Sequence, residues 1–348
     1  MGIFNRKKKW GNFGGNINIH SDLKKSDIPK IIVEKNIHSL QLFQFPNPKR
    51  QTWETLNEFF CKYPDIGLRV LWYECQDLSF YKLIPNIRKF TIATYNIKDY
   101  SILKTNTKLK HFGIEETKSK AVDISFIKEF TDLESLYVDG MKKGLENVKH
   151  LLNLQTLTFR GVKLDNLDFL TEFTKLQELN LLYGSYKDLN AVSKLNDLKE
   201  LEISRVRQIP DYQFLRNLMN LEKLCFEGMS EMSILPDLSG LKSLKRIQVD
   251  NNSRLNDISS ISQIPNLEEF LLFFPENFKA SLRKKLTEQA YQIVMESKTI
   301  KSTSIWLRVN NEQRENLRKK GVEFWNYSAK FGQSIPLTSE QSEPPLPV

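Results

Sequence analysis

A short apolar pattern recurs through the middle of the chain, and its regularity leaves few folds open. In each copy, an apolar residue is followed by a second one three positions later and a third two positions after that. The first members of the nine copies are Ile87, Leu109, Leu133, Leu154, Leu176, Leu198, Leu221, Leu244 and Leu267. They are 21 to 24 residues apart. Chance clustering would not keep this phase, so the pattern predicts an internal repeat of about 22 residues.

Each copy of the repeat is expected to contain one strand and one return segment. The last two apolar residues of a copy alternate, as on a strand with one buried face. Apolar residues of the return segments, such as Phe126 and Ile127, are expected to cover that face. One copy alone cannot bury this stripe, so the copies must stack and their strands must form one parallel sheet. The predicted fold is therefore an α/β solenoid.

The pattern resembles the leucine-rich repeats of the 22-residue, internalin-like class. The resemblance implies a right-handed superhelix with a parallel sheet on its concave side and caps at both ends. The family usually has an asparagine eight residues after the first leucine, and here only Asn252 keeps it. This departure puts the regularity of the turns in doubt but not the architecture.

The sequence divides into five expected segments. Residues 1–35 are expected to be a basic, flexible N-terminal segment, with a glycine-rich stretch at Gly11–Gly15. Residues 36–86 are expected to be an N-terminal cap with a helix over 52–63 and an irregular strand over Leu68–Trp72. Residues 87–273 are the solenoid of nine repeats. Residues 274–330 are expected to be a C-terminal α/β cap, and 331–348 a proline-containing disordered tail. Within the C-terminal cap we expect a helix over about 277–297, a strand at Ile305, Leu307 and Val309, and a short helix over 312–320.

The charge of the chain lies outside the repeats. The formal net charge is +9, yet residues 87–273 carry 26 basic and 26 acidic side chains. On the positions expected to face outward from the concave sheet, acidic residues outnumber Lys and Arg by eight to four. Such a face should repel phosphate, so nucleic acid is not expected to bind through the solenoid. The expected partner is a protein with a basic or mixed surface.

We expect a partner to bind at outward positions of the concave sheet, where Tyr137, Arg160, Leu182 and Phe273 are of types that tend to anchor interfaces. Tyr183, on the adjoining turn, is expected to join them. The candidates are Tyr137, Asp139, Arg160, Asn180, Leu182, Tyr183, Glu202, Cys225, Glu227, Asp250 and Phe273.

Several classes of function are not expected. The four histidines lack the spacing of a zinc site, and no nucleophile and base arrangement stands out, so we expect no metal, cofactor, small-molecule substrate or catalytic residue. No apolar run is long enough to span a membrane. Three widely spaced cysteines suggest reduced thiols in a cytoplasmic protein, and the abundance of Lys, Asn and Ile suggests a bacterial source.

Two functions remain open from the sequence. The first is a protein-binding scaffold that recognises its partner through the concave sheet. The alternative is an effector or enzyme whose repeats select the substrate and whose segment 277–330 carries an activity.

Overall fold

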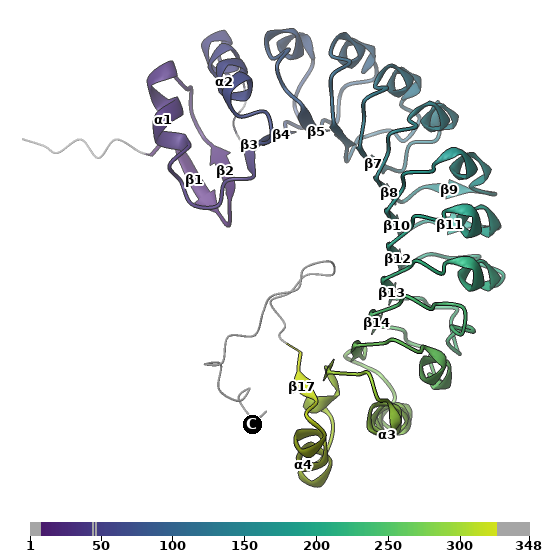
Figure 1. Ribbon diagram of the computed structural model, residues 1–348. Helices are drawn as coiled ribbons and strands as arrows, with labels where there is room; N and C mark the ends of the chain where they lie inside the picture. The colour runs from purple at the N-terminus through teal and green to yellow at the C-terminus, as the bar shows by residue number, and fades with distance from the viewer. Residues whose placement is uncertain (1–7, 44, 46, 326–348) are drawn as a thin grey trace, which may run out of the picture. The chain divides into compact units, whose positions relative to one another are not determined.

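The computed structural model describes residues 8–43, 45 and 47–325 (Figure 1). The chain forms two compact units, Met1–Leu195 and Asn196–Val348, and each is described by itself.

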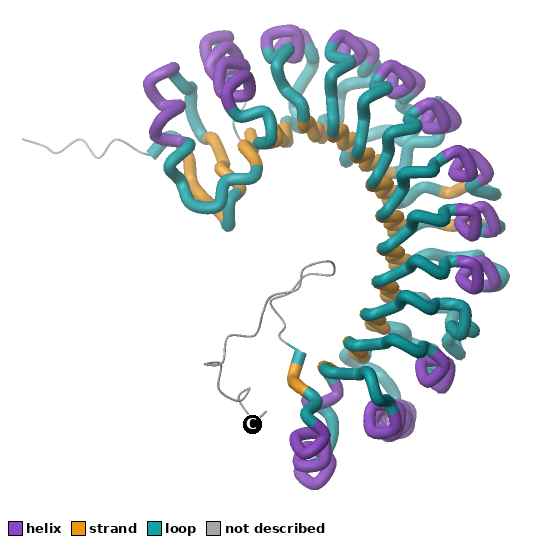
Figure 2. Tube along the Cα trace, in the orientation of Figure 1, coloured by secondary structure: helices purple, strands orange, loops and turns teal. Residues whose placement is uncertain are grey.

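Unit 1 contains a sheet whose repeat strands are parallel and follow chain order. The register keeps equivalent residues opposite each other, as between Tyr137 and Thr158. The strands are β3 (Ser39–Phe43), β4 (Gly67–Leu71), β5 (Lys89–Ala93), β6 (His111–Ile114), β7 (Ser135–Asp139), β8 (Thr156–Arg160) and β10 (Glu178–Leu182). Within this unit the strands line the inner side of the curve and the helices lie outside (Figure 2).

Unit 2 repeats the arrangement with a second run of parallel strands. They are β12 (Glu200–Ser204), β13 (Lys223–Glu227), β14 (Arg246–Asp250), β15 (Glu269–Phe273), β16 (Ser302–Thr303) and β17 (Glu323–Phe324). The apolar residues of the repeat, such as Leu224 and Phe226, are fully buried on the side facing the return segments. The predicted leucine-rich-repeat fold is therefore confirmed.

The return segments are mostly short 3₁₀ helices. They are η2 (Ser79–Leu83), η3 (Ser101–Thr105), η4 (Ser125–Glu129), η5 (Leu145–His150), η6 (Asp168–Glu172), η7 (Asn190–Lys194), η8 (Gln213–Asn217) and η9 (Ser259–Gln263). An aspartate before many of them accepts a hydrogen bond from the N–H two residues later, as Asp188 does from Asn190 at 2.6 Å. This is the local turn that short polar side chains favour. Behind the main sheet, β9 (Lys163–Leu164) and β11 (Ser185–Tyr186) form a small parallel pair.

The expectation of a flexible segment over 1–35 is wrong for its described part. Residues 8–35 contain the hairpin β1 (Trp10–Phe13) and β2 (Asn16–Ile19), followed by η1 (Lys25–Asp27) and α1 (Ile28–Ile31). Strand β2 pairs in parallel with β3, which buries Ile17 and Ile19 completely. Lys9 is also engaged, since its ammonium group donates to the carboxylate of the buried Asp27 at 2.6 Å. The glycines that suggested flexibility form the hairpin turn, where Gly14 and Gly15 have positive φ.

The helix expected over 52–63 is α2 (Arg50–Lys62), which buries Trp53, Leu56, Phe59 and Phe60. The following segment, expected as an irregular strand, is the regular strand β4, paired with both β3 and β5.

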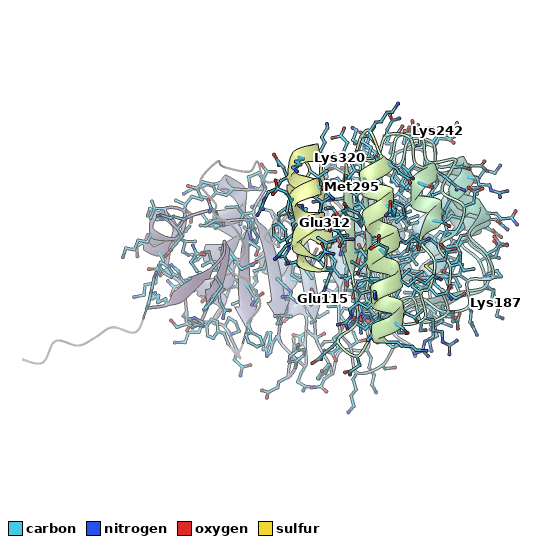
Figure 3. All side chains as sticks on the ribbon, turned by 90° about the horizontal axis from the view of Figure 1, so that it is seen from below. Glu115, Lys187, Lys242, Met295, Glu312 and Lys320 are labelled. Atoms are coloured by element: carbon cyan, nitrogen blue, oxygen red, sulfur yellow. The ribbon has the colours of Figure 1, made fainter. Side chains whose placement is uncertain are left out.

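The C-terminal part of unit 2 extends the sheet and covers it. Helices α3 (Ala280–Glu296) and α4 (Asn311–Lys320) fall close to the expected spans. They lie side by side (Figure 3), and Lys320 donates to the carbonyl of Met295 at 2.7 Å. The strand expected at Ile305, Leu307 and Val309 is wrong, because Ile305–Leu307 is the 3₁₀ helix η10 and the strand lies earlier, at Ser302–Thr303. The expected tail at 331–348 lies outside the described residues.

Candidate protein-binding surface

The strand register of unit 1 gathers five of the predicted binding residues on three adjacent strands. One row across β7, β8 and β10 consists of Tyr137, Thr158 and Asn180, and the next consists of Asp139, Arg160 and Leu182. Thr158 is the only member of these rows that was not on the predicted list. The sequence therefore predicts correctly that these side chains are neighbours, because the repeat phase determines which residues lie opposite each other.

Asp139 holds two cations at the end of β7. Asp139 is only 6% exposed. Its carboxylate accepts hydrogen bonds from Lys120 Nζ at 3.0 Å and from Arg160 Nη1 at 2.9 Å. Lys120 also donates to the Asp139 carbonyl at 2.9 Å. Asp139 was predicted to be a contact residue for a partner. Instead it is almost completely buried and supports Arg160.

Tyr183 lies on the turn after β10 and forms the outer layer of this group. Tyr183 is 47% exposed, and the guanidinium of Arg160 lies 5.0 Å from the centre of its ring. The backbone of Tyr183 is left-handed, with φ of 55°. The sequence placed Tyr183 near the face but gave no indication of its backbone conformation.

The side chains in the row of Tyr137, Thr158 and Asn180 are only partly exposed, although they point outward from their strands. Burial raises the pKa of Tyr137 to about 12, with Asp139 adding to the effect. Asn180 donates to Thr158 Oγ1 at 3.1 Å and to Glu178 Oε1 at 2.7 Å. These contacts fix the side chains in place, which lowers the conformational entropy that binding would cost.

Sequence reasoning missed a charge pair that crosses several strands of unit 1. Arg69 of β4 donates twice to the carboxylate of Glu115, at 2.9 and 2.7 Å, and also to Gln41 at 3.2 Å. Such a two-point Arg–carboxylate contact fixes both orientation and position. The signal was present, because Arg69 occupies an outward strand position, but its strand was expected to be irregular.

A group of polar side chains around His111 adjoins this pair. The two ring nitrogens of His111 lie 3.2 Å from Thr91 Oγ1 and 2.9 Å from Ser135 Oγ. Burial lowers the pKa of His111 to about 4, and Lys89 adds to the effect, so the ring is uncharged at neutral pH. Neutral imidazole suits this position because it is flanked by hydroxyl groups.

The outward positions of unit 2 bring acidic side chains together. Glu202 lies opposite Cys225, and Glu227 lies opposite Asp250. Burial raises the pKa of Asp250, and the neighbouring carboxylate of Glu227 raises it further. Arg205 approaches Glu227 at 3.5 Å, which offsets part of the charge.

Two predicted binding residues of unit 2 are engaged within the chain. Cys225 is 2% exposed, so its thiol presents almost no surface, and burial with nearby Glu202, Glu227 and Asp250 raises its pKa well above the ordinary value. Phe273 packs with its ring centre 5.8 Å from that of Trp325. Trp325 comes from the segment after β17 and also covers Leu271. Folding of the C-terminal segment over β15 could not be read from the repeat pattern.

A hollow of about 590 Å³ lies in unit 1, away from these rows. Its aromatic part is formed by Trp53, Trp72 and Phe80, and the ring centres of Trp53 and Phe80 are 4.2 Å apart. Its charged residues are two basic and two acidic ones, namely Arg50, Lys82, Glu74 and Asp77. The balance of charge gives no preference for an anionic or a cationic ligand.

Within residues 8–43, 45 and 47–325, no three His, Cys, Asp or Glu side chains are grouped so that they could hold a metal ion. None of the helices described there combines the length and apolar character that a membrane crossing needs.

Comparison with known proteins gives a partial match in sequence. A protein phosphatase 1 regulatory inhibitor subunit PPP1R7 homolog from Arabidopsis thaliana is 26% identical over 137 residues. The match covers 38% of this chain and 40% of that protein, so it spans less than half of the relative. No protein-family model matches the chain.

Several solved structures are similar to parts of the chain. A leucine-rich-repeat protein from Leptospira interrogans matches with a TM-score of 0.49 and 16% identity, covering 77% of this chain and 73% of that one. Internalin C2 of Listeria monocytogenes matches with a TM-score of 0.43 and 21% identity, covering 57% of this chain and 82% of the other. An internalin (inlF) from the same organism matches with a TM-score of 0.42 and 19% identity, covering 69% and 63%. The repeat itself is defined by the chain's own sequence phase and strand pairing.

Proposed function

We propose that this leucine-rich-repeat protein is a binding scaffold without catalytic activity, and that it recognises a protein partner through the outward faces of its strands. The observation that carries the proposal is the set of rows described above, in which charged and aromatic side chains are held in fixed positions by their neighbours. Preorganised side chains of this kind bind with a smaller loss of entropy than free ones.

The Arabidopsis relative is, by its name, a regulatory inhibitor subunit of a phosphatase. A role in which the chain acts by binding another protein agrees with that description. We extend the proposal to a cytoplasmic location, where the three free cysteines, Cys61, Cys75 and Cys225, would remain reduced.

The acidic side chains of unit 2 favour a basic region of the partner. Glu227 and Asp250 are adjacent, and burial raises the pKa of Asp250, with the charge of Glu227 adding to the effect. A Lys or Arg from a partner would stabilise these two carboxylates.

The test is capture of partners from the native organism, identified by mass spectrometry, with wild-type protein and a variant carrying Glu202→Lys, Glu227→Lys and Asp250→Lys. We expect the variant to lose the captured partner. A matched control reverses the same number of charges at the exposed residues Asp197, Glu276 and Glu296. If both variants, shown to be folded by circular dichroism, capture the partner as well as wild type does, the acidic face of unit 2 has no part in recognition.

A further inference from the structure

One position of the repeat requires a left-handed backbone. The seventh residue after the first apolar residue has positive φ in six successive copies: Gly140, Gly161, Tyr183, Arg205, Gly228 and Asn251. Glycine and asparagine adopt this conformation at little cost, whereas a bulky side chain is strained there. Tyr183 therefore occupies a position where the fold would be served better by a smaller residue. Strain retained in this way points to a functional use of the side chain.

The ring of Tyr183 is used as a platform for Arg160. The guanidinium lies over the ring at 5.0 Å, and Nη1 donates to the buried carboxylate of Asp139 at 2.9 Å. Among the described residues, Nε and Nη2 of Arg160 donate to no protein atom. With 44% of its side chain exposed, Arg160 presents these remaining N–H groups to solvent in a fixed orientation. A fixed guanidinium of this kind is suited to bind a carboxylate through two hydrogen bonds.

Lysines recur on the loops that follow β6, β7 and β8 of unit 1. The ninth residue after the first apolar residue is lysine in three consecutive copies, at Lys118, Lys142 and Lys163. All three are exposed, and no carboxylate lies within ion-pair distance of any of them in the described part of the chain. In contrast, Lys120 and Lys143 on the first two of these loops, and Lys187 after β10, are each paired with an aspartate. Lys118, Lys142 and Lys163 therefore add positive charge to the loops that follow β6, β7 and β8, and Asp165 offsets part of the charge of Lys142.

We propose that Arg160, held by Asp139 and Tyr183, binds a glutamate or aspartate side chain of an acidic segment in a protein partner, and that Lys118, Lys142 and Lys163 attract further carboxylates of that segment. The proposal rests on the function proposed above and names the chemistry of the partner at unit 1. An extended phosphate backbone fits less well, because the adjacent strand β10 presents the carboxylate of Glu178. An acidic peptide can place single carboxylates away from it.

The test uses the full chain and a fluorescein-labelled nine-residue peptide in which glutamate and serine alternate, with binding followed by fluorescence anisotropy. The same peptide with glutamine in place of glutamate is the matched probe. We expect the glutamate peptide to bind at least about tenfold more tightly, the ratio expected when charge-assisted hydrogen bonds are lost. Arg160→Gln should reduce its affinity by a similar factor. Lys149→Gln, which removes one charge from the exposed face of η5, should leave it nearly unchanged.

Two further variants separate the platform from net charge. Arg160→Lys keeps the charge but loses the planar guanidinium, and Tyr183→Asn removes the ring while leaving a residue that accepts positive φ. Both should weaken peptide binding several-fold, and Tyr183→Asn should do so without lowering the urea midpoint of unfolding.

Three results would overturn the proposal. The first is equal binding of the two peptides, and the second is an equal loss with Lys149→Gln and Arg160→Gln. The third is tighter, Arg160-dependent binding of a nine-nucleotide oligothymidine, which would assign these residues to nucleic-acid binding. Because the peptide assay needs no native partner, its failure alongside successful partner capture would reject this inference and leave the scaffold function standing.

Discussion

The outward strand residues of the two units occupy equivalent repeat positions but differ in how their charges are compensated. In unit 1, Asp139 binds Arg160 and Lys120. In unit 2, the equivalent positions place Glu227 beside Asp250, and the pKa of Asp250 is raised by burial and by that neighbour. The same strand pairing produces both arrangements. The difference shows that the repeat determines which side chains become neighbours. The charges of those side chains determine whether their interaction stabilises or destabilises the fold.

The comparison extends to pH. In unit 1 the buried, neutral His111 has a lowered pKa, so acid should weaken the fold there. In unit 2 the raised pKa of Asp250 means that acid should relieve unfavourable charge. Three predictions test this contrast, from the largest effect to the smallest.

The largest expected effect concerns His111. Its folded-state pKa of about 4 lies below the ordinary histidine value of 6.5, so the unfolded chain binds a proton first as the pH falls. Stability should be fully present above pH 6.5 and should decrease by ~3 kcal/mol as the pH falls through about 4. In His111→Gln this part of the pH dependence should be absent when urea unfolding is measured between pH 7 and 4. His150→Gln, at an exposed histidine of η5, is the control, and an identical profile for both variants would contradict the prediction.

The second prediction concerns the compensated carboxylate of unit 1. Asp139→Asn removes the negative charge that holds Lys120 and Arg160, and should lower the free energy of unfolding by ~1–2 kcal/mol at pH 7. The value is moderate because both cations are nearly half exposed and remain solvated. Asp165→Asn, which breaks only the exposed pair with Lys187, should give no measurable change. Equal effects of the two substitutions in urea unfolding would show that Asp139 is an ordinary surface charge.

The smallest effect is expected at Asp250, with the opposite sign. Asp250→Asn should raise the free energy of unfolding at pH 7 by a few tenths of a kcal/mol to about 1 kcal/mol, because like charges on adjacent strands repel. The folded-state pKa of Asp250 is raised, so the penalty exists above that pKa and disappears as the pH falls below the ordinary aspartate value of 3.8. The gain should accordingly vanish in acid. A loss of stability at pH 7, with Asp197→Asn as the exposed control, would mean that the Asp250 carboxylate is compensated after all.

Much of the fold could be predicted because the repeat is a local property of the sequence. The phase of the leucines located β5 to β8, β10 and β12 to β15, and it also identified the neighbours Tyr137, Asn180 and Arg160. Helices α2, α3 and α4 followed from apolar spacing. The hairpin β1–β2 was missed because its strands are short and its glycines were taken as a sign of flexibility.

The candidate surface was predicted in outline but not in detail. Outward direction on a strand does not ensure exposure, as the burial of Cys225 demonstrates. Phe273 was assigned to a partner, yet it packs against Trp325 of the chain's own C-terminal segment. Such contacts join residues far apart in sequence, and no periodic pattern records them.

The repeat, the parallel register and the side chains that each row presents follow from the period of the apolar residues and can be predicted from the amino-acid sequence. Which of those side chains are available to a partner depends on the folded structure. The left-handed turn at Tyr183, the support of Arg160 by a buried Asp139 and the covering of Phe273 by Trp325 depend on backbone conformation and on packing between distant residues. Burial, hydrogen bonding and charge compensation at each position are set by these three-dimensional neighbours, and they distinguish a binding residue from a structural one.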